Sequence, residues 1–351
     1  MIEAIRLVAA ALTRVGRDLT GGGRRTIFGA VPRPPLSRGF ALSRRGFALS
    51  CRYSALTLAL AGCAGRTRAQ PLTGKAGATA ALFAADPRIG QYVSSAWTFA
   101  TSSFWLSGPA GLVLVDTQFL PSGGLEAAAL AEQATGQKLV TAFVLHANPD
   151  KFNGTSALQG RGVEVWTARQ VLDAMPAIHA KRVAAFYDRY KPDYPLEMPT
   201  PAVFGAATMP LQAAGLSLTA HVLGPGCSEA HVVLQFEDQL FVGDLVANGA
   251  HSWLEIGRTD EWLRRIRELE ALRPRFVHPG RGPSGGPELL TRQRTYLEDV
   301  IAQVAAEKPS GPPDQAALAR VRAALEQRYP GHRFPVFLEI GLPAEWRRQA
   351  G

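Results

Sequence analysis

Apolar residues along this chain form short runs separated by longer amphipathic stretches. Residues 111–116 are apolar up to a terminal aspartate and follow residues 104–106 at hairpin distance, which indicates two strands, the second buried on both faces. An Ala-rich helix is expected over residues 126–135, because Gly136 provides a stop signal. Another buried strand is expected over residues 140–145.

The same alternation continues towards the C-terminus. We expect a short helix from residue 157, a strand over 163–166, helices over 168–190, strands over 216–222, 231–236 and 239–242, an amphipathic helix over 261–272, a strand over 276–277, and helices over 288–306 and 314–329. This order predicts an α/β fold in which the loops at strand ends carry the chemistry.

The composition is that of a globular protein, with 46% hydrophobic and 19% charged residues. The formal net charge of +9 is unevenly distributed, because residues 1–62 carry +8 and the rest of the chain only +1. The main part of the protein is therefore nearly neutral, and binding to nucleic acid is not expected.

The basic N-terminal segment has the features of an export signal. Arg44 and Arg45 lie in the sequence SRRGFAL, which resembles a twin-arginine signal. The apolar stretch 53–62 is too short to span a bilayer, for which about 20 residues are needed. It leads into Leu-Ala-Gly-Cys, which resembles a bacterial lipobox with Cys63 as the lipidated residue. We expect an exported protein, anchored by this lipid in a bacterial envelope and facing the periplasm or the exterior.

Four segments, in order, resemble motifs of the metallo-β-lactamase superfamily. They are Val-Leu-Val-Asp-Thr over 113–117, Leu-His-Ala-Asn-Pro-Asp-Lys-Phe-Asn-Gly over 145–154, Gly-Pro-Gly-Cys-Ser over 224–228 with Gly-Asp at 243–244, and Pro-Gly-Arg-Gly over 279–282. The resemblance implies an αββα sandwich with one or two zinc ions at one edge.

The chain divides accordingly into four parts. Residues 1–62 are the N-terminal extension with its signal peptide, and we expect translation to start downstream of Met1. Residues 63–90 form a tether, 91–305 the metallo-β-lactamase-like domain, and 306–351 a helical extension packed on it. The exported part keeps Cys227 as its only further cysteine, so no internal disulfide is expected.

The resemblance also implies which positions would bind metal. In the family three histidines hold the first metal, and the Asp and His of the long motif hold the second together with the last His. The positions matching the first metal site are His146, Asn148 and Cys227. Those matching the second are Asp150, Lys151 and Arg281, with Asp244 as the bridge between metals and Asp116 supporting the ligands from behind.

Lys151 and Arg281 cannot act as ordinary metal ligands. A protonated ammonium or guanidinium has no lone pair for a cation. The carboxylates of Asp150 and Asp244 would cost several kcal/mol if they were buried without partners. We therefore expect Lys151 and Arg281 to replace the second metal by forming ion pairs with these two acids.

The sequence does not decide whether the first metal site binds a zinc ion or is empty. His146 and Cys227 are good zinc ligands, and Asn148 can bind through its carbonyl oxygen. Candidate substitute ligands are His231, His251 and His278. The sequence thus predicts either one zinc ion or none per chain, and no second zinc site.

Two functions follow, and whether the chain is an enzyme is left open between them. The first is a hydrolase with at most one zinc, in which metal-activated water attacks an ester, amide or thioester and Asp150 orients or deprotonates the water, with Asp244 as the second expected catalytic residue. The alternative is an inactive binding protein whose Lys151 and Arg281 hold an anionic ligand or a partner. A further option is Cys227 as a nucleophile with a histidine base. β-Lactamase activity is not expected.

Replacing Cys63 by alanine is expected to move the protein from the membrane fraction to the soluble fraction, because the lipid would lose its attachment point. Cell fractionation and immunoblotting of a bacterium that makes the full chain would measure this. Cys51→Ala, which removes the other leader thiol, is the matched control and should stay in the membrane. A Cys63→Ala protein that remained membrane-bound would contradict the lipobox.

Overall fold

The computed structural model describes residues 72–73 and 77–351. The expected signal peptide with Arg44 and Arg45, and the expected lipidation site Cys63, lie outside these residues. Among the helices of the described part, none is both long and apolar enough to cross a membrane.

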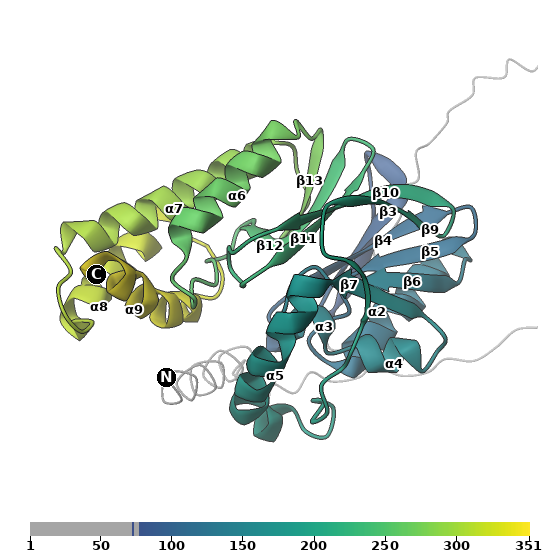
Figure 1. Cartoon of the computed structure of the whole chain (residues 1–351), viewed down its shortest axis with the longest axis horizontal. Coiled ribbons are helices and arrows are strands. Elements are labelled where there is room, and N and C mark those ends of the chain that lie inside the picture. Colours follow the sequence, from purple (N-terminus) through teal and green to yellow (C-terminus); the bar gives the residue numbers. More distant parts are fainter. Residues whose placement is uncertain (1–71, 74–76) are drawn as a thin grey trace, which may run out of the picture.

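Two sheets form the centre of the molecule (Figure 1). The first has the order β1 to β8, antiparallel up to β5 and parallel from β5 to β8. Its strands are β1 (Leu72–Thr73), β2 (Thr79–Phe83), β3 (Asp86–Val93), β4 (Ser102–Gly108), β5 (Gly111–Val115), β6 (Leu139–Phe143), β7 (Glu164–Ala168) and β8 (Ala202–Gly205).

The second sheet has the order β13-β12-β11-β10-β9, and only β12 and β13 run parallel. Its strands are β9 (Met209–Ala213), β10 (Leu216–Leu223), β11 (His231–Phe236), β12 (Gln239–Ala247) and β13 (Phe276–Arg281). The sheets pack face to face, as the contact between Phe104 of β4 and Phe241 of β12 shows, with 5.5 Å between ring centroids.

Helices cover the outer face of each sheet (Figure 1). On the first sheet these are α2 (Pro121–Thr135), α3 (Pro149–Phe152), α4 (Thr155–Gln159) and α5 (Arg169–Tyr190), and on the second α6 (Thr259–Ala271) and α7 (Glu288–Ala306). The predicted αββα sandwich is thereby confirmed.

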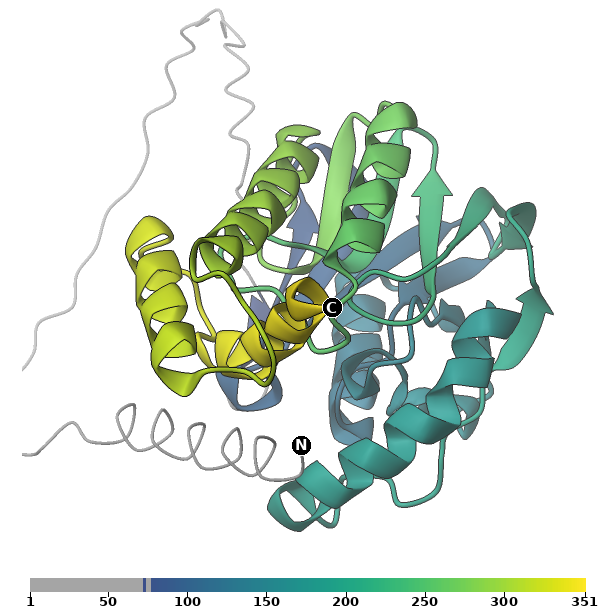
Figure 2. The same cartoon turned by 60° about the vertical axis from the view of Figure 1, so that its left-hand side comes forward.

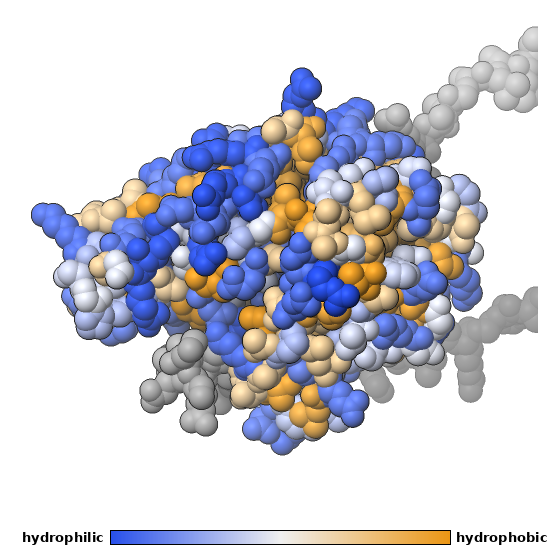
Figure 3. Space-filling model, viewed as in Figure 1, coloured by the Kyte–Doolittle hydropathy of each residue, from blue (hydrophilic) through white to orange (hydrophobic). Residues whose placement is uncertain are grey.

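Helix α6 shows how the sequence pattern places these helices. Trp262, Ile266 and Leu269 recur at helical spacing and are buried, while Arg264, Arg267 and Glu268 between them are exposed. In Figure 3 the outer face of α6 and α7 is mostly hydrophilic, whereas apolar residues gather nearer the middle of the molecule. The apolar stripe of α6 therefore faces the second sheet.

Two further helices, α8 (Gln315–Arg328) and α9 (Val336–Ala350), follow α7 and lie beside it (Figure 2). Leu318 and Leu325 of α8 and Trp346 of α9 share one buried apolar cluster with α6, α7 and the second sheet. The C-terminal helices thus extend the core of the domain and have no separate core.

The sheet begins earlier than the sequence indicated. Strands β2 and β3 pair with each other and β3 with β4, so the region expected to be a tether up to residue 90 supplies two strands. Their pattern was hard to recognise because β3 contains Asp86, Pro87 and Gly90. Gly90 lies across from Trp105, where a Cβ would come within 1.9 Å of the indole ring. Glycine is a weak strand former, but no larger residue fits at position 90 against the Trp105 ring.

The stability of the fold is expected to depend on pH through His278 of β13. Its ring stacks on Phe241 at 4.4 Å, Nε2 donates to Gln239 Oε1 and Nδ1 accepts from Ser284 Oγ. Burial lowers the pKa of His278 from 6.5 to about 3. Between these two values the unfolded chain binds a proton that the folded chain does not, so the free energy of unfolding falls as the pH falls.

From pH 7 to pH 5 this contribution amounts to about 2 kcal/mol. Urea unfolding of the wild type and of His278→Gln at both pH values measures it. The variant should be less stable at pH 7 and should lose less stability on acidification. An equal loss of unfolding free energy in the wild type and the variant would show that His278 is not the source of the pH dependence.

Candidate functional site

The residues suggested by the motifs meet where strands of both sheets end. The first sheet supplies the loop after β6 and the short helix α3. The second supplies the loop between β10 and β11, the first residue of β11, the second half of β12 and the last residue of β13. The side chains brought together in this way are His146, Asp150, Lys151, Cys227, His231, Asp244 and Arg281.

Helix α3 is held in place by the end of β5. Thr117 donates to the Lys151 carbonyl from its N–H at 2.7 Å and from its hydroxyl at 3.0 Å. Pro149 opens the helix at a position where a missing N–H costs nothing. Gly154 follows against the Thr117 carbonyl, where a Cβ would come within 2.0 Å. This packing explains why the motif ends in glycine.

Lys151 lies at the centre of three carboxylates. Its Nζ is 2.9 Å from Asp244 Oδ1, 3.3 Å from Asp150 Oδ2 and 3.8 Å from Asp116 Oδ2. The side chain is fully buried. Burial alone would lower the pKa of Lys151, but the three acids outweigh it and raise that pKa above its usual value.

Arg281 completes the network from the end of β13. It donates to Asp150 Oδ2 at 2.7 Å, to Asp244 Oδ2 and to the carbonyl of Phe99 at 3.3 Å. Thr101 adds a hydrogen bond to Asp150 at 3.0 Å. Two buried cations therefore face two carboxylates, as expected from the motif resemblance.

The protonation of the three acids differs. Burial raises the pKa of Asp116 to about 7. Burial acts in the same direction on Asp150 and Asp244, but Lys151 and Arg281 outweigh it and hold both pKa values below their usual range. Asp150 and Asp244 are therefore ionised and balance the two cations, and Asp116 is partly protonated near neutral pH.

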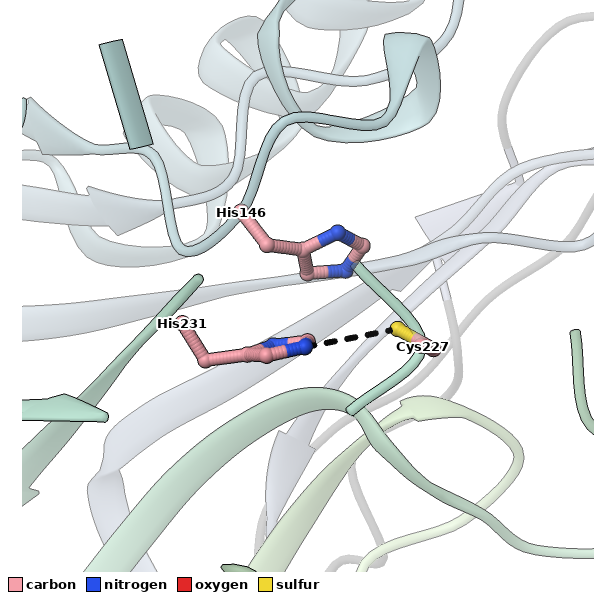
Figure 4. A group of neighbouring side chains, drawn as sticks. All are labelled: His146, Cys227 and His231. Atoms are coloured by element: carbon pink, nitrogen blue, oxygen red, sulfur yellow. Dashed lines mark hydrogen bonds between the residues drawn. The ribbon is translucent and has the colours of Figure 1, made fainter. Parts of the chain in front are cut away.

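A second group of side chains lies beside this network, since His146 Nε2 is 3.8 Å from Asp244 Oδ2. Figure 4 shows its three residues. The ligand atoms of His146, Cys227 and His231 all lie within 4.8 Å of one another, and all three residues are buried. Backbone pairing brings the segments together, because the N–H of Val232 donates to the carbonyl of Leu145 at 2.7 Å. His231 Nε2 accepts the N–H of Ser228 at 3.2 Å and is 3.8 Å from Cys227 Sγ.

The His-Cys-His group suits a single zinc ion. Burial lowers the pKa of both histidines, that of His146 to about 4, so both rings are neutral. The lone pair of His231 Nε2 accepts the N–H of Ser228, and a zinc ion bound there would replace that contact. Both ring nitrogens of His146 and Nδ1 of His231 are buried without a hydrogen-bond partner, an arrangement that is costly unless another group satisfies them. Imidazole nitrogens and a cysteine sulfur are ligands that zinc prefers.

The other expected site residues lie around these two groups. Asp116 accepts the N–H of Leu145 at 2.9 Å and supports the loop that carries His146. Asn148 directly precedes α3 and lines the adjacent pocket. His251 bonds to Tyr296 at 3.0 Å under the C-terminal helices, and His278 has both ring nitrogens hydrogen-bonded, so neither belongs to the His-Cys-His group.

A pocket opens over the ion-pair network. Its wall includes aromatic residues and Arg182 that the sequence motifs did not indicate, because they come from helices and loops far apart in the chain. The lining residues are Phe99, Phe119, Asn148, Pro149, Asp150, Arg182, Phe186, Asp244, Trp253, Arg281 and Phe337.

Solved structures with a similar fold include a metallo-β-lactamase from Pontibacter korlensis, at 21% identity and a TM-score of 0.48, over 62% of this chain and 99% of that one. TMB-1 matches at 16% identity and a TM-score of 0.50, over 63% and 97% of the two chains. DIM-1 metallo-β-lactamase, solved after exposure to ceftazidime, matches at 16% identity and a TM-score of 0.50, over 62% and 96%. At these identities the likeness concerns the fold alone.

None of the curated proteins matches the chain. The sequence model of one family matches residues 96–281, which is more than half of the chain and contains both groups of site residues. On this match the chain belongs to the metallo-beta-lactamase superfamily.

Proposed function

We propose that this protein is a hydrolase that uses one zinc ion and has replaced the second metal of its family by two side-chain cations. The observation that carries the proposal is the meeting of His146, Cys227 and His231 next to Asp244, whose other partners are Lys151 and Arg281. His231 takes the place of the third ligand for which the motif alone suggested Asn148.

The residues around this group have distinct roles in the proposed reaction. A zinc ion held there would act as a Lewis acid and lower the pKa of a water molecule to about 7. Asp244 connects the group to the pocket, because its Oδ2 is 3.8 Å from His146 Nε2 and it also lines the pocket. Its low pKa makes Asp244 a weak base but a good hydrogen-bond acceptor, so it orients the attacking water.

Asp150 acts in the same way from the other side of Arg281. It also lines the pocket, and its ionised carboxylate accepts hydrogen bonds from Thr101 and Arg281. These contacts fix its position, which favours orientation of a substrate or a water over proton transfer. The substrate class is an ester, amide or thioester.

The geometry does not favour the alternative of an anion-binding protein. Lys151 is fully buried among three carboxylates, and the guanidinium of Arg281 is engaged by two of them and by a backbone carbonyl. Neither cation is left for an external anion. Cys227 is not favoured as a nucleophile either, because burial raises the pKa of its thiol well above the usual value.

We also propose that the protein acts outside the cytoplasm, held by a lipid on Cys63. The support is the order of the twin-arginine sequence, the short apolar stretch and the lipobox along the leader.

The full chain, purified without a chelator or a polyhistidine tag, is expected to contain about one zinc ion, because one set of three good ligands is present. Elemental mass spectrometry measures this, with hydrolysis of p-nitrophenyl acetate as a second readout. Cys227→Ser and His231→Ala should lose the metal and most of the activity, roughly 100-fold. His221→Ala, a histidine of β10 outside the group, is the matched control and should keep both.

Asn148→Ala decides between the two candidates for the third ligand. Retained zinc in Asn148→Ala together with lost zinc in His231→Ala supports the proposed set. The reverse result would overturn it. A zinc-free wild-type chain that still hydrolyses the ester would overturn the metal-dependent mechanism.

The replacement of the second metal is expected to be reversible by mutation. Lys151→His with Arg281→His restores two imidazoles beside Asp150 and Asp244, so this double variant should bind about two zinc ions per chain. Without added zinc it should be less stable by roughly 3–5 kcal/mol, because buried carboxylates lose their partners.

Thermal unfolding with and without zinc, together with metal content, measures this prediction. The matched control is Lys151→Met with Arg281→Met, which removes the same charges without adding ligands. The control should lose stability in the same way. Added zinc should raise its thermal stability no more than it raises that of the wild type. Equal metal content in both double variants would contradict the proposal that Lys151 and Arg281 occupy the place of a second metal.

A further inference from the structure

The candidate site is closed to solvent in this structure. His146, Cys227 and His231 are at most 1% exposed, and Asp150 and Asp244 at most 6%. The space between the ion-pair network and the aromatic side chains above it is about 30 Å³, which leaves room for about two water molecules. An ester, amide or thioester therefore cannot reach the site unless some of the surrounding side chains move.

Five aromatic side chains close this space, and we call them the aromatic cover. They are Phe99, Phe119, Phe186, Trp253 and Phe337. The ring centroid of Phe99 lies 5.0 Å from that of Phe119, 5.8 Å from that of Phe186 and 6.1 Å from that of Phe337. Phe337 in turn contacts Trp253 at 4.9 Å. The cover is thus one continuous set of ring contacts, to which segments far apart in the chain contribute.

Helix α9 takes part in two separate apolar clusters. Leu338 and Leu342 belong to the core of the second sheet, together with α6, α7 and α8. Phe337 and Ile340 belong to another cluster, which includes Phe186 of α5 on the first sheet. Helix α9 is therefore held by one half of the sandwich and reaches across to the other. Contacts of the second kind can break locally while the core behind α9 stays folded.

Phe337 is the residue of α9 that lies over the ion-pair network. Its ring centre is 5.3 Å from the guanidinium carbon of Arg281, and the ring is 1% exposed. It lies beyond residue 281, where the family match ends, so the motifs do not encode this part of the cover. Asp244 connects the covered space to the metal-ligand candidates, because it lines that space and its Oδ2 is 3.8 Å from His146 Nε2.

The backbone is strained on both sides of the contact between Phe99 and Phe337. Phe99 has a φ of 69°, and Phe334, whose ring stacks on Phe337 at 5.2 Å, has a φ of 60°. The left-handed region is unfavourable for bulky side chains and persists only where the surroundings hold it. The ring contacts of the cover therefore hold strained backbone in place, and breaking them would release part of that strain.

We propose that the first turn of α9 is an autoinhibitory lid, in which Phe337 closes the route from solvent to Asp244 and the His-Cys-His group. The lid opens when the contacts of Phe337 with Phe99 and Trp253 break, while the rest of α9 stays attached to the second sheet. Its effect on hydrolysis rests on the proposed function, whereas the closure itself concerns access alone.

Access is tested with the thiol of Cys227, which lies in the closed group. The full chain is freed of metal with a chelator and treated with iodoacetamide, and mass spectrometry of the Cys227 peptide separates its labelling from that of Cys51 and Cys63. The wild type should be labelled slowly. Phe337→Ala should be labelled about 10-fold faster or more, because the ring that closes the lid is lost. Phe337→Leu, which keeps part of the packing, should have a smaller effect in the same direction.

Phe236→Ala is the matched control, because Phe236 is a buried phenylalanine at the far end of β11 from His231 and lies outside the aromatic cover. Both alanine variants lose a buried ring, so both are expected to unfold more easily. Labelling through global unfolding rises steeply with small additions of urea, whereas labelling through a local opening does not. Phe337→Ala should therefore show fast labelling that is insensitive to low urea, and Phe236→Ala should be labelled slowly without urea.

If Phe337→Ala does not fold, Phe337→Leu is compared with Phe236→Leu in the same way, and only the first should accelerate labelling. Fast labelling of the wild type, or equal acceleration by the variants at both positions, overturns the lid even if the chain contains zinc and hydrolyses p-nitrophenyl acetate. Acceleration confined to position 337 supports it even if the chain contains no zinc and hydrolyses no ester.

Discussion

Two carboxylates buried at the junction of two sheets cannot remain without positive charge, and the rest of the site is built around this constraint. Asp150 comes from helix α3, which follows β6 of the first sheet, and Asp244 from β12 of the second sheet, and both are almost inaccessible to water. Metal ions balance such charges elsewhere in the superfamily, whereas here an ammonium from α3 and a guanidinium from β13 do so. Because Lys151 and Arg281 are part of the chain, this balance is present as soon as the protein folds.

The replacement changes the chemistry available at the edge of the sandwich. A side-chain cation stabilises an acid but provides no open coordination position and no activated water. The proposed metal chemistry is therefore assigned to the neighbouring His-Cys-His group, where buried ring nitrogens lack partners. Asp244 contacts both regions, so the charge balance and the proposed catalytic group are coupled through one carboxylate.

The same balance shapes the pocket above. Since Arg281 is engaged by Asp150 and Asp244, it presents a neutralised surface to the pocket, and Phe337 covers part of it. The helices after residue 306 share the core of the second sheet and so position α9 firmly against this opening. The C-terminal extension is therefore part of the site as well as of the fold.

Much of the fold could be predicted from local pattern. The wholly apolar β5, the amphipathic α6 and the long α7 are each specified by residues close together in the chain, and the motif spacing placed Lys151 and Arg281 opposite Asp150 and Asp244. Strands β2 and β3 were not predicted, because some of their residues are required by contacts across the sheet and not by strand propensity. Gly90, which faces the Trp105 ring, is an example.

Side-chain type and motif order determined which positions could not bind metal, because an ammonium or a guanidinium lacks a lone pair in any fold. Only the tertiary structure decided which donors meet. His231 joins His146 through pairing between the start of β11 and the loop after β6, and Phe337 reaches the pocket from a helix more than fifty residues past the last motif. Such contacts depend on how distant segments pack, so they cannot be predicted from local periodicity.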